Sequence, residues 1–331
     1  MKLSRVIRLL CAVALMGGIG AVIAVPAGAS PLRGNGHEGS WFNQGSGRFP
    51  IGRGFFQPPA TCTGTLAAPG VLAGTYRSSV VVDGVCAVDG GAATILGNLT
   101  LSPGSALNAT FALNDLPGGT GTSSLTVFGS VSVLNGAVLG MGCEANFSPC
   151  SDDPNAATGG TLTGSNHVFG SLTSWSPLGV IVHASTINGN VAEIGGGGGL
   201  SCNVPTTGIF SLLQSPVFSD YEDNSVGGYI AVVGLQTCWM GMLRNTVRDS
   251  IYDVNNSFGD PDANEVLSNT VQRNMWCFGN TPQVQYGDSG GVPNQVAGRA
   301  VGECGFGVLQ PNPAPTPTSP AGPLAPISVK S

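Results

Sequence analysis

The sequence predicts an all-β fold, a right-handed parallel β-helix in which coils of roughly 20–25 residues stack along one axis. Short apolar pentapeptides recur along the chain, and an asparagine precedes most of the later ones at a fixed distance. Glycine accounts for 52 of the 331 residues, and a sustained helical period is missing. This composition favours short strands and tight turns over long helices.

Eight pentapeptides form the repeat. Their first position is always Val or Ile, the fifth is apolar, and the third is Gly in six of the eight. They begin at Ile95, Val127, Val168, Ile187, Val226, Val247, Val271 and Val296. Short spacings indicate single coils, whereas spacings near 40 residues indicate either two coils or one coil with an excursion. Because Asp249 and Arg273 replace the glycine in two pentapeptides, we expect the third position to lie at the edge of a turn.

A second register supports the first. Asparagine stands two residues before the pentapeptide in five of the last six cases, and only Ser185 departs from this pattern. The five are Asn166, Asn224, Asn245, Asn269 and Asn294. Stacked amides can hydrogen-bond along a solenoid axis, so we expect these residues to form one structural column at a bend.

The same register brings opposite charges together. Asp223 and Arg244 share one position in consecutive coils, and Asp249 and Arg273 share another. We expect each pair to be adjacent on the surface as an ion pair that adds little to stability. The alternative is a charged strip that binds a ligand.

The first residues have the pattern of a signal peptide. Lys2, Arg5 and Arg8 precede an apolar stretch at 9–24, and Ala27-Gly28-Ala29 offers a cleavage site. This predicts a secreted or cell-surface protein with no membrane span after cleavage at residue 29; an uncleaved anchor is the alternative. The remaining chain divides into an irregular lead at 30–60, the β-helix domain at 61–305 and a Pro-rich, disordered tail at 306–331.

The net charge and the cysteine count indicate which partners and which cellular compartment suit the chain. Cleavage would remove three of the 12 basic residues and none of the 18 acidic ones, which takes the net charge from −6 to −9 and argues against nucleic acid as a partner. Eight cysteines would remain, an even number that suggests disulfides in an exported chain. The pairs we favour are Cys277–Cys304 across neighbouring coils, Cys62–Cys86 one coil apart, Cys143–Cys150 and Cys202–Cys238.

Two motifs suggest chemistry. Asp253, Asn255, Asp260 and Asp262 lie in a segment that resembles a calcium loop, although its spacing departs from that of an EF-hand. No other cofactor is expected. Residues 287–291, Gly-Asp-Ser-Gly-Gly, match the nucleophile motif of trypsin-like proteases. Because none of the three histidines has the sequence context of that family, we interpret the segment as a turn.

A carbohydrate site is the other possibility. Asp220, Glu222, Asp249 and Arg273 fall on successive coils and could bind or cleave a cell-wall or extracellular polysaccharide. That function requires Asp220, Asp249 and Arg273 to converge in a groove, whereas a structural protein would pair them along an outer flank. The polygalacturonase and pectate lyase signatures are missing, so no catalytic residue is assigned.

The run from about Cys62 to Gly305 resembles uncharacterised exported bacterial β-helix proteins. The likeness rests on the Ile187-Asn-Gly-Asn-Val191 type of pentapeptide and on the segments at 219–228, 259–266 and 279–291. The resemblance implies the fold and export and carries no activity. The sequence thus favours a structural or interaction role at the cell surface or envelope over an enzyme, and it leaves the oligomeric state open.

Overall fold

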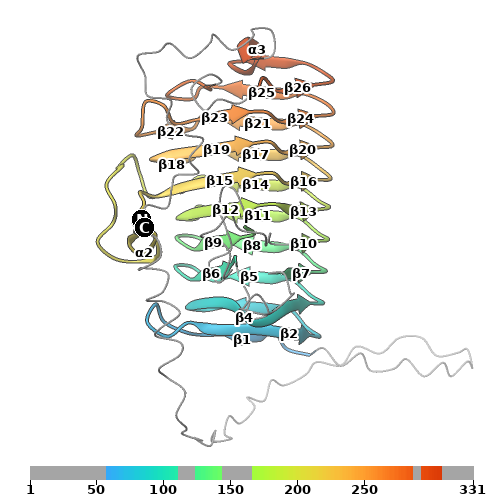
Figure 1. Cartoon of the computed structure of the whole chain (residues 1–331), viewed down its shortest axis with the longest axis vertical. Helices are drawn as coiled ribbons and strands as arrows, with labels where there is room; N and C mark the ends of the chain where they lie inside the picture. The colour runs from blue at the N-terminus through green and yellow to red at the C-terminus, as the bar shows by residue number, and fades with distance from the viewer. Residues whose placement is uncertain (1–56, 111–123, 144–165, 286–291, 308–331) are drawn as a thin grey trace, which may run out of the picture.

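The computed structural model describes residues 57–110, 124–143, 166–285 and 292–307. These residues form a parallel β-helix whose coils stack from the blue N-terminal end to the red C-terminal end in Figure 1. Every strand pair in the described residues is parallel, as the sequence predicts. The predicted signal peptide, most of the lead and nearly all of the tail lie outside the described residues.

Each coil contributes to three walls. The first wall is a ten-stranded sheet. In spatial order its strands are β1 (Ala60–Cys62), β3 (Val80–Val82), β5 (Leu99–Leu101), β8 (Val131–Val133), β11 (Leu172–Trp175), β14 (Val191–Ile194), β17 (Ile230–Val233), β21 (Ile251–Val254), β25 (Met275–Phe278) and β27 (Ala300–Gly302).

The other two walls belong to one 15-stranded sheet. They are joined by β4 (Val85–Ile95), which pairs with β6 at its start and with β7 at its end. The second wall comprises β6 (Ala106–Ala109), β9 (Val138–Met141), β12 (Gly179–His183), β15 (Phe218–Glu222), β19 (Trp239–Leu243) and β23 (Glu265–Leu267). The third wall comprises β7 (Leu125–Val127), β10 (Asn166–Val168), β13 (Ser185–Ile187), β16 (Ser225–Val226), β20 (Thr246–Val247), β24 (Thr270–Val271) and β26 (Gln295–Val296).

A few elements lie outside these walls. Strand β2 (Gly70–Tyr76) pairs with β4 in the first coil. Strands β18 (Gln236–Thr237) and β22 (Ser257–Phe258) form a small sheet between the first and second walls. The helices are short: α2 (Ile209–Leu213) lies between β14 and β15, and α3 (Cys304–Gly307) follows β27.

The repeat register predicted from the sequence is confirmed. The first residues of all eight pentapeptides are lateral neighbours in the third wall, and the fifth residues are neighbours in the first wall. Each interval is therefore one coil, and the long ones contain an excursion. The third position lies in the turn between these walls, where Gly129 N–H donates to the Gly97 carbonyl at 2.9 Å and later coils repeat the bond.

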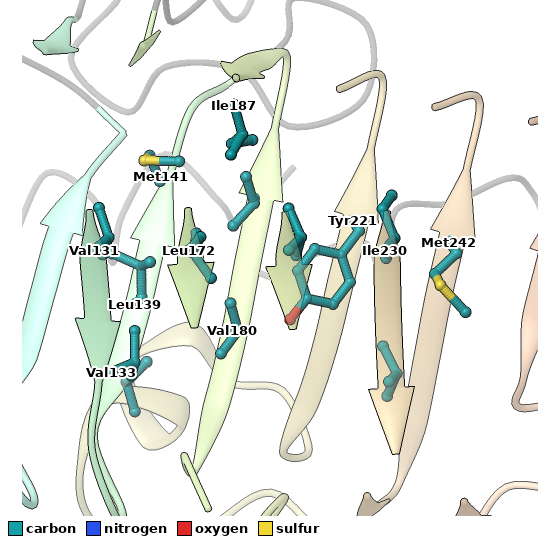
Figure 2. Close-up of a cluster of buried hydrophobic side chains, with 14 of the residues drawn as sticks. Val131, Val133, Leu139, Met141, Leu172, Val180, Ile187, Tyr221, Ile230 and Met242 are labelled. Carbon is teal, nitrogen blue, oxygen red and sulfur yellow. The ribbon is translucent and has the colours of Figure 1, made fainter. Parts of the chain in front are cut away.

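Alternation along each strand builds the core. In the first wall Val131 and Val133 point inward, while Ser132 between them points outward, because successive side chains of a strand alternate between its two sides. Figure 2 shows how such inward side chains from neighbouring coils stack into a continuous apolar column. Each coil buries its apolar residues against the next one, so that the stack as a whole provides the stabilising burial.

The expected asparagine column lies at the corner between the second and third walls. Nδ2 of Asn224, Asn245 and Asn269 donates to Oδ1 of the next asparagine at 3.0 Å, and the column ends at Asn294. Oδ1 of Asn166, further down the stack, accepts the Leu125 N–H at 2.6 Å. The residue before the column has a positive φ in four coils, at Ala184, Asp223, Arg244 and Ser268. The amides therefore satisfy backbone groups that this sharp turn removes from the strand ladder.

Two further polar columns were not predicted. At the corner between the first and second walls, Asn256 N–H donates to Asn280 Oδ1 at 3.0 Å, and Asn280 N–H donates to Glu303 Oε1 at 3.0 Å. At the turn between the third and first walls, side chains at the fourth pentapeptide position accept a backbone N–H from the next coil; Ser130 N–H to Asn98 Oδ1 at 2.9 Å is one example. All three turns are thus tied along the axis by side chains.

Three disulfides add covalent ties in the described residues, and all three match the expected pairs: Cys62–Cys86, Cys202–Cys238 and Cys277–Cys304. The fourth expected pair includes Cys150, which lies outside the described residues. Disulfides persist in oxidising compartments, so the chain is suited to an extracytoplasmic environment.

Candidate functional site: a buried His-Asp-Glu cluster

The outward side of the second wall holds a cluster of titratable side chains. His183 is the last residue of β12, and Asp220 and Glu222 lie on the neighbouring strand β15. Val182 and Tyr221 point into the core, so alternation places these three side chains on the opposite side of the wall. The strand register pairs His183 directly with Glu222. The pair Val182–Tyr221 lies between that pair and Asp220. Although they point outward, all three are buried, with exposed fractions of 2%.

Short polar contacts join the cluster. His183 Nε2 lies 3.1 Å from Asp220 Oδ2. Arg244, in the next coil, donates from Nη2 to Glu222 Oε2 at 2.6 Å and from Nε to Asp223 Oδ2 at 2.8 Å. The predicted pair Asp223–Arg244 is therefore present, and it extends to a buried carboxylate.

An indole ring covers one flank of the cluster. Trp239 lies on β19, and its Nε1 donates to Glu265 Oε1 at 3.0 Å. Between Asp220 and Glu265 the wall has Gly241, where a Cβ atom would lie 2.4 Å from the Trp239 ring and 2.7 Å from Asp220 Oδ1. Only glycine leaves room for this close packing, which keeps water from Asp220.

Burial sets the protonation of the cluster. Removal from water raises the pKa of Asp220 well above its ordinary value, since the charged carboxylate loses solvation. Burial, followed by the Asp220 charge, raises the pKa of Glu222 from 4.5 to about 8. Burial also lowers the pKa of His183. Burial therefore favours a neutral imidazole at His183, and it makes negative charge on the two carboxyl groups unfavourable unless a cation lies beside them.

Two other carboxylates lie inside the solenoid. Glu193, on β14, accepts hydrogen bonds of 2.8 Å from the hydroxyls of Ser219 and Tyr221. Asp253, on β21, accepts one of 2.9 Å from Asn280 Nδ2 and another from Asn256. Burial raises the pKa of each carboxyl to about 7. Both are fully enclosed, so they serve to hold neighbouring coils together.

The structure brings together only part of the predicted polysaccharide site. Asp220 and Glu222 are neighbours, but Asp249 and Arg273 lie at the exposed turn between the third and first walls. There Arg273 Nε is 3.7 Å from Asp249 Oδ1. The structure therefore does not bring Asp220, Asp249 and Arg273 into one groove, because Asp220 lies on the second wall and the other two lie at the turn between the third and first walls. Asp249 and Arg273 form the outer ion pair that the structural interpretation expects.

The predicted calcium ligands do not converge either. Asp253 points into the core, whereas Asn255 lies at a left-handed turn with a φ of 55°. Asp260 and Asp262 are in the turn after β22, where Asp260 Oδ1 accepts the Asp262 N–H at 3.0 Å. The structure does not bring the four residues together, since the wall alternation turns Asp253 away from the others.

His183 was not among the site residues predicted from the sequence. His183 stands four residues before its pentapeptide, and Glu222 occupies the same position in the next coil. Extension of the repeat register by this one position would have placed the two side by side. Ser289 of the protease-like motif lies outside the described residues.

The fold and the cluster define this chain as a disulfide-linked parallel β-helix protein. Comparisons with protein-family models, curated proteins and solved structures found no match. The resemblance to exported bacterial β-helix proteins therefore stays a prediction. Among the described residues, no helix has the length and apolar character needed to cross a bilayer.

Proposed function

We propose that this chain is an exported protein with a structural or interaction role at the cell surface or envelope. The observation that carries the proposal is the use of polar side chains as ties between coils. The asparagine column, the Asp249–Arg273 pair and the interior carboxylates all bond one coil to the next. With three disulfides in addition, the solenoid has the features of a rigid rod that persists outside the cytoplasm.

Fractionation tests this proposal directly. The full chain with a C-terminal epitope is produced in a bacterial host, and each fraction is analysed for mass and free thiols. We expect a chain that begins after residue 29 in the extracytoplasmic fraction, with its cysteines resistant to alkylation until they are reduced. The matched control replaces Ala27 and Ala29 by Asp and should retain the leader. A reduced, full-length wild-type chain in the cytoplasm would contradict the proposal.

A second candidate function is polysaccharide binding, favoured by aromatic side chains on the outward side of the first wall. Tyr252 and Trp276 are lateral neighbours there. The ring of Trp276 lies 6.3 Å from that of Phe278, and the ring of Tyr229 lies 5.9 Å from that of Tyr252. Phe278 is 42% exposed. Exposed aromatic faces can pack against the C–H faces of sugar rings, and a row along the axis suits an extended chain.

A glycan array with residues 30–331 tests the second candidate. Wild-type protein should bind a polysaccharide, and Trp276→Ala should weaken the binding at least about tenfold, the effect of 1.4 kcal/mol. Phe128→Ala is the control, because Phe128 is 49% exposed at the turn between the third and first walls. Equal binding by the Trp276 variant, or no binding by the wild type, would rule out this surface.

A further inference from the structure

We infer that His183, Asp220 and Glu222 bind a divalent transition-metal ion, with Zn²⁺ as the expected occupant. Each residue offers a ligand atom, and these atoms lie within 4.8 Å of one another. Ligand atoms of a tetrahedral Zn²⁺ lie about 3.3–3.6 Å apart, since Zn–N and Zn–O distances are about 2.0–2.2 Å. Small side-chain rotations on the two paired strands would therefore bring the three ligand atoms onto one ion. The inference goes beyond the proposed function and does not depend on it.

The Asp220 carboxylate supplies an independent observation. Its Oδ1 atom is buried and has no hydrogen-bond partner among the described residues. A buried carboxylate oxygen without a partner is unfavourable and calls for an explanation. A metal ion bound by this carboxylate would provide the missing interaction.

The charge of the cluster also favours a bound cation. Asp220, Glu222 and Asp223 are three carboxylates, and the only guanidinium bonded to them in the described residues is that of Arg244. Glu265, held by Trp239, adds a further acidic group nearby. A divalent cation would balance the excess negative charge in a place where water is excluded. Arg244 binds Glu222 through Oε2, so the other oxygen of that carboxylate is the one assigned to the ion.

The ligand set favours a transition metal over calcium or magnesium. One imidazole with two carboxylates suits Zn²⁺, whereas Ca²⁺ and Mg²⁺ prefer oxygen ligands alone. The ligands are also held rigidly, because β12 and β15 are paired strands and the Ser185 hydroxyl donates to the His183 carbonyl at 2.7 Å. Since the side chains are buried, the ion would join two adjacent coils in a structural role.

Metal titration of the untagged mature chain tests the inference. The protein is treated with a chelator, dialysed and titrated with ZnCl₂, and bound metal is measured by mass spectrometry. We expect one Zn²⁺ per chain and, at 100 times the dissociation constant, a rise in the melting midpoint of about 5 °C or more. His183→Gln and Asp220→Asn should each weaken binding at least about tenfold, the effect of losing a ligand.

Two control variants separate the site from general effects. His167→Gln removes a partly exposed histidine from the third wall, and Glu193→Gln removes a buried carboxylate inside the solenoid; both should bind Zn²⁺ as the wild type does. Failure of the wild-type chain to take up Zn²⁺ overturns the inference, whatever the variants do. Unchanged uptake by folded His183→Gln overturns it as well, and so does stabilisation by CaCl₂ but not by ZnCl₂.

Discussion

Replacement of Asn245 by alanine removes the central amide of the asparagine column. Nδ2 of Asn245 donates to the Tyr221 carbonyl at 2.7 Å and to Asn269 Oδ1 at 3.0 Å, and its Oδ1 accepts two hydrogen bonds of 3.0 Å from Asn224. The side chain is 1% exposed, so water does not replace these contacts readily.

The size of the effect follows from which partners keep another bond. Asn224 Nδ2 retains the Val182 carbonyl, and Asn269 Oδ1 retains the backbone N–H of residue 245. The backbone N–H of Asn224 and the carbonyl of Tyr221 lose their side-chain partner. Since a buried backbone group without a partner costs about 1–3 kcal/mol, we expect Asn245→Ala to destabilise the protein by about 3 kcal/mol.

Urea unfolding with the disulfides intact measures this loss. Circular dichroism should show a lower midpoint at an unchanged slope, and hydrogen exchange should show faster exchange of the Asn224 N–H. Thr246→Ala is the matched control, because the neighbouring Thr246 side chain is exposed on the third wall and should change stability by less than about 0.5 kcal/mol. A loss below about 1 kcal/mol for Asn245→Ala, or one equal to that of the control, would refute the role of the column.

Three further predictions follow from the contacts along the axis. The native state holds the proton of Glu193 more tightly than the unfolded chain does, so stability should fall as the pH rises from about 4.5 to 7. Glu193→Gln should reduce that fall by up to about 3 kcal/mol in melts across this range, and parallel curves for the two proteins would contradict it. Replacement of both Cys277 and Cys304 by Ser removes a disulfide that joins residues 27 apart in sequence, and it should lower the free energy of unfolding in urea by about 3–4 kcal/mol. A loss under about 1 kcal/mol would show that this disulfide is dispensable for stability. Arg244→Met leaves a buried carboxylate without its guanidinium and should cost about 2–3 kcal/mol, whereas Arg273→Met at an exposed pair should cost less than about 0.5 kcal/mol. Equal losses for the two arginine variants in the same unfolding assay would show that burial does not govern these ion pairs.

The repeat could be predicted because equivalent positions of successive coils lie beside one another along the axis and therefore carry similar residues. Val168, Ile187 and Val226 are separated by unequal lengths of chain, yet they are neighbours because each fills the same place in a stacked core. The asparagines could be predicted for a similar reason, since an amide at a turn needs an identical partner in the next coil. The fold therefore followed from residues whose chemistry repeats.

The cluster on the second wall could not be found in this way, because its members do not repeat. His183 and Glu222 share a register position with leucine in the following coil, so no pattern marks them as a group. Asp253 shows the opposite error. Alternation from the inward Ile251 places Asp253 inside, but burial of a carboxylate in the core is unfavourable without hydrogen-bond partners. The amides of Asn256 and Asn280 supply those partners, and only the structure shows that they are there.

The left-handed turn between the second and third walls has a consequence for how such a chain can grow. From β15 onward two residues separate the two walls and the second of them is an asparagine, whereas 15 residues separate β6 from β7 and 24 separate β9 from β10. The strands on either side still pair without a slip. New sequence could therefore be inserted at this corner of a later coil. The insertion would remove one asparagine from the hydrogen-bonded column, while the strands of the coils above and below would keep their register.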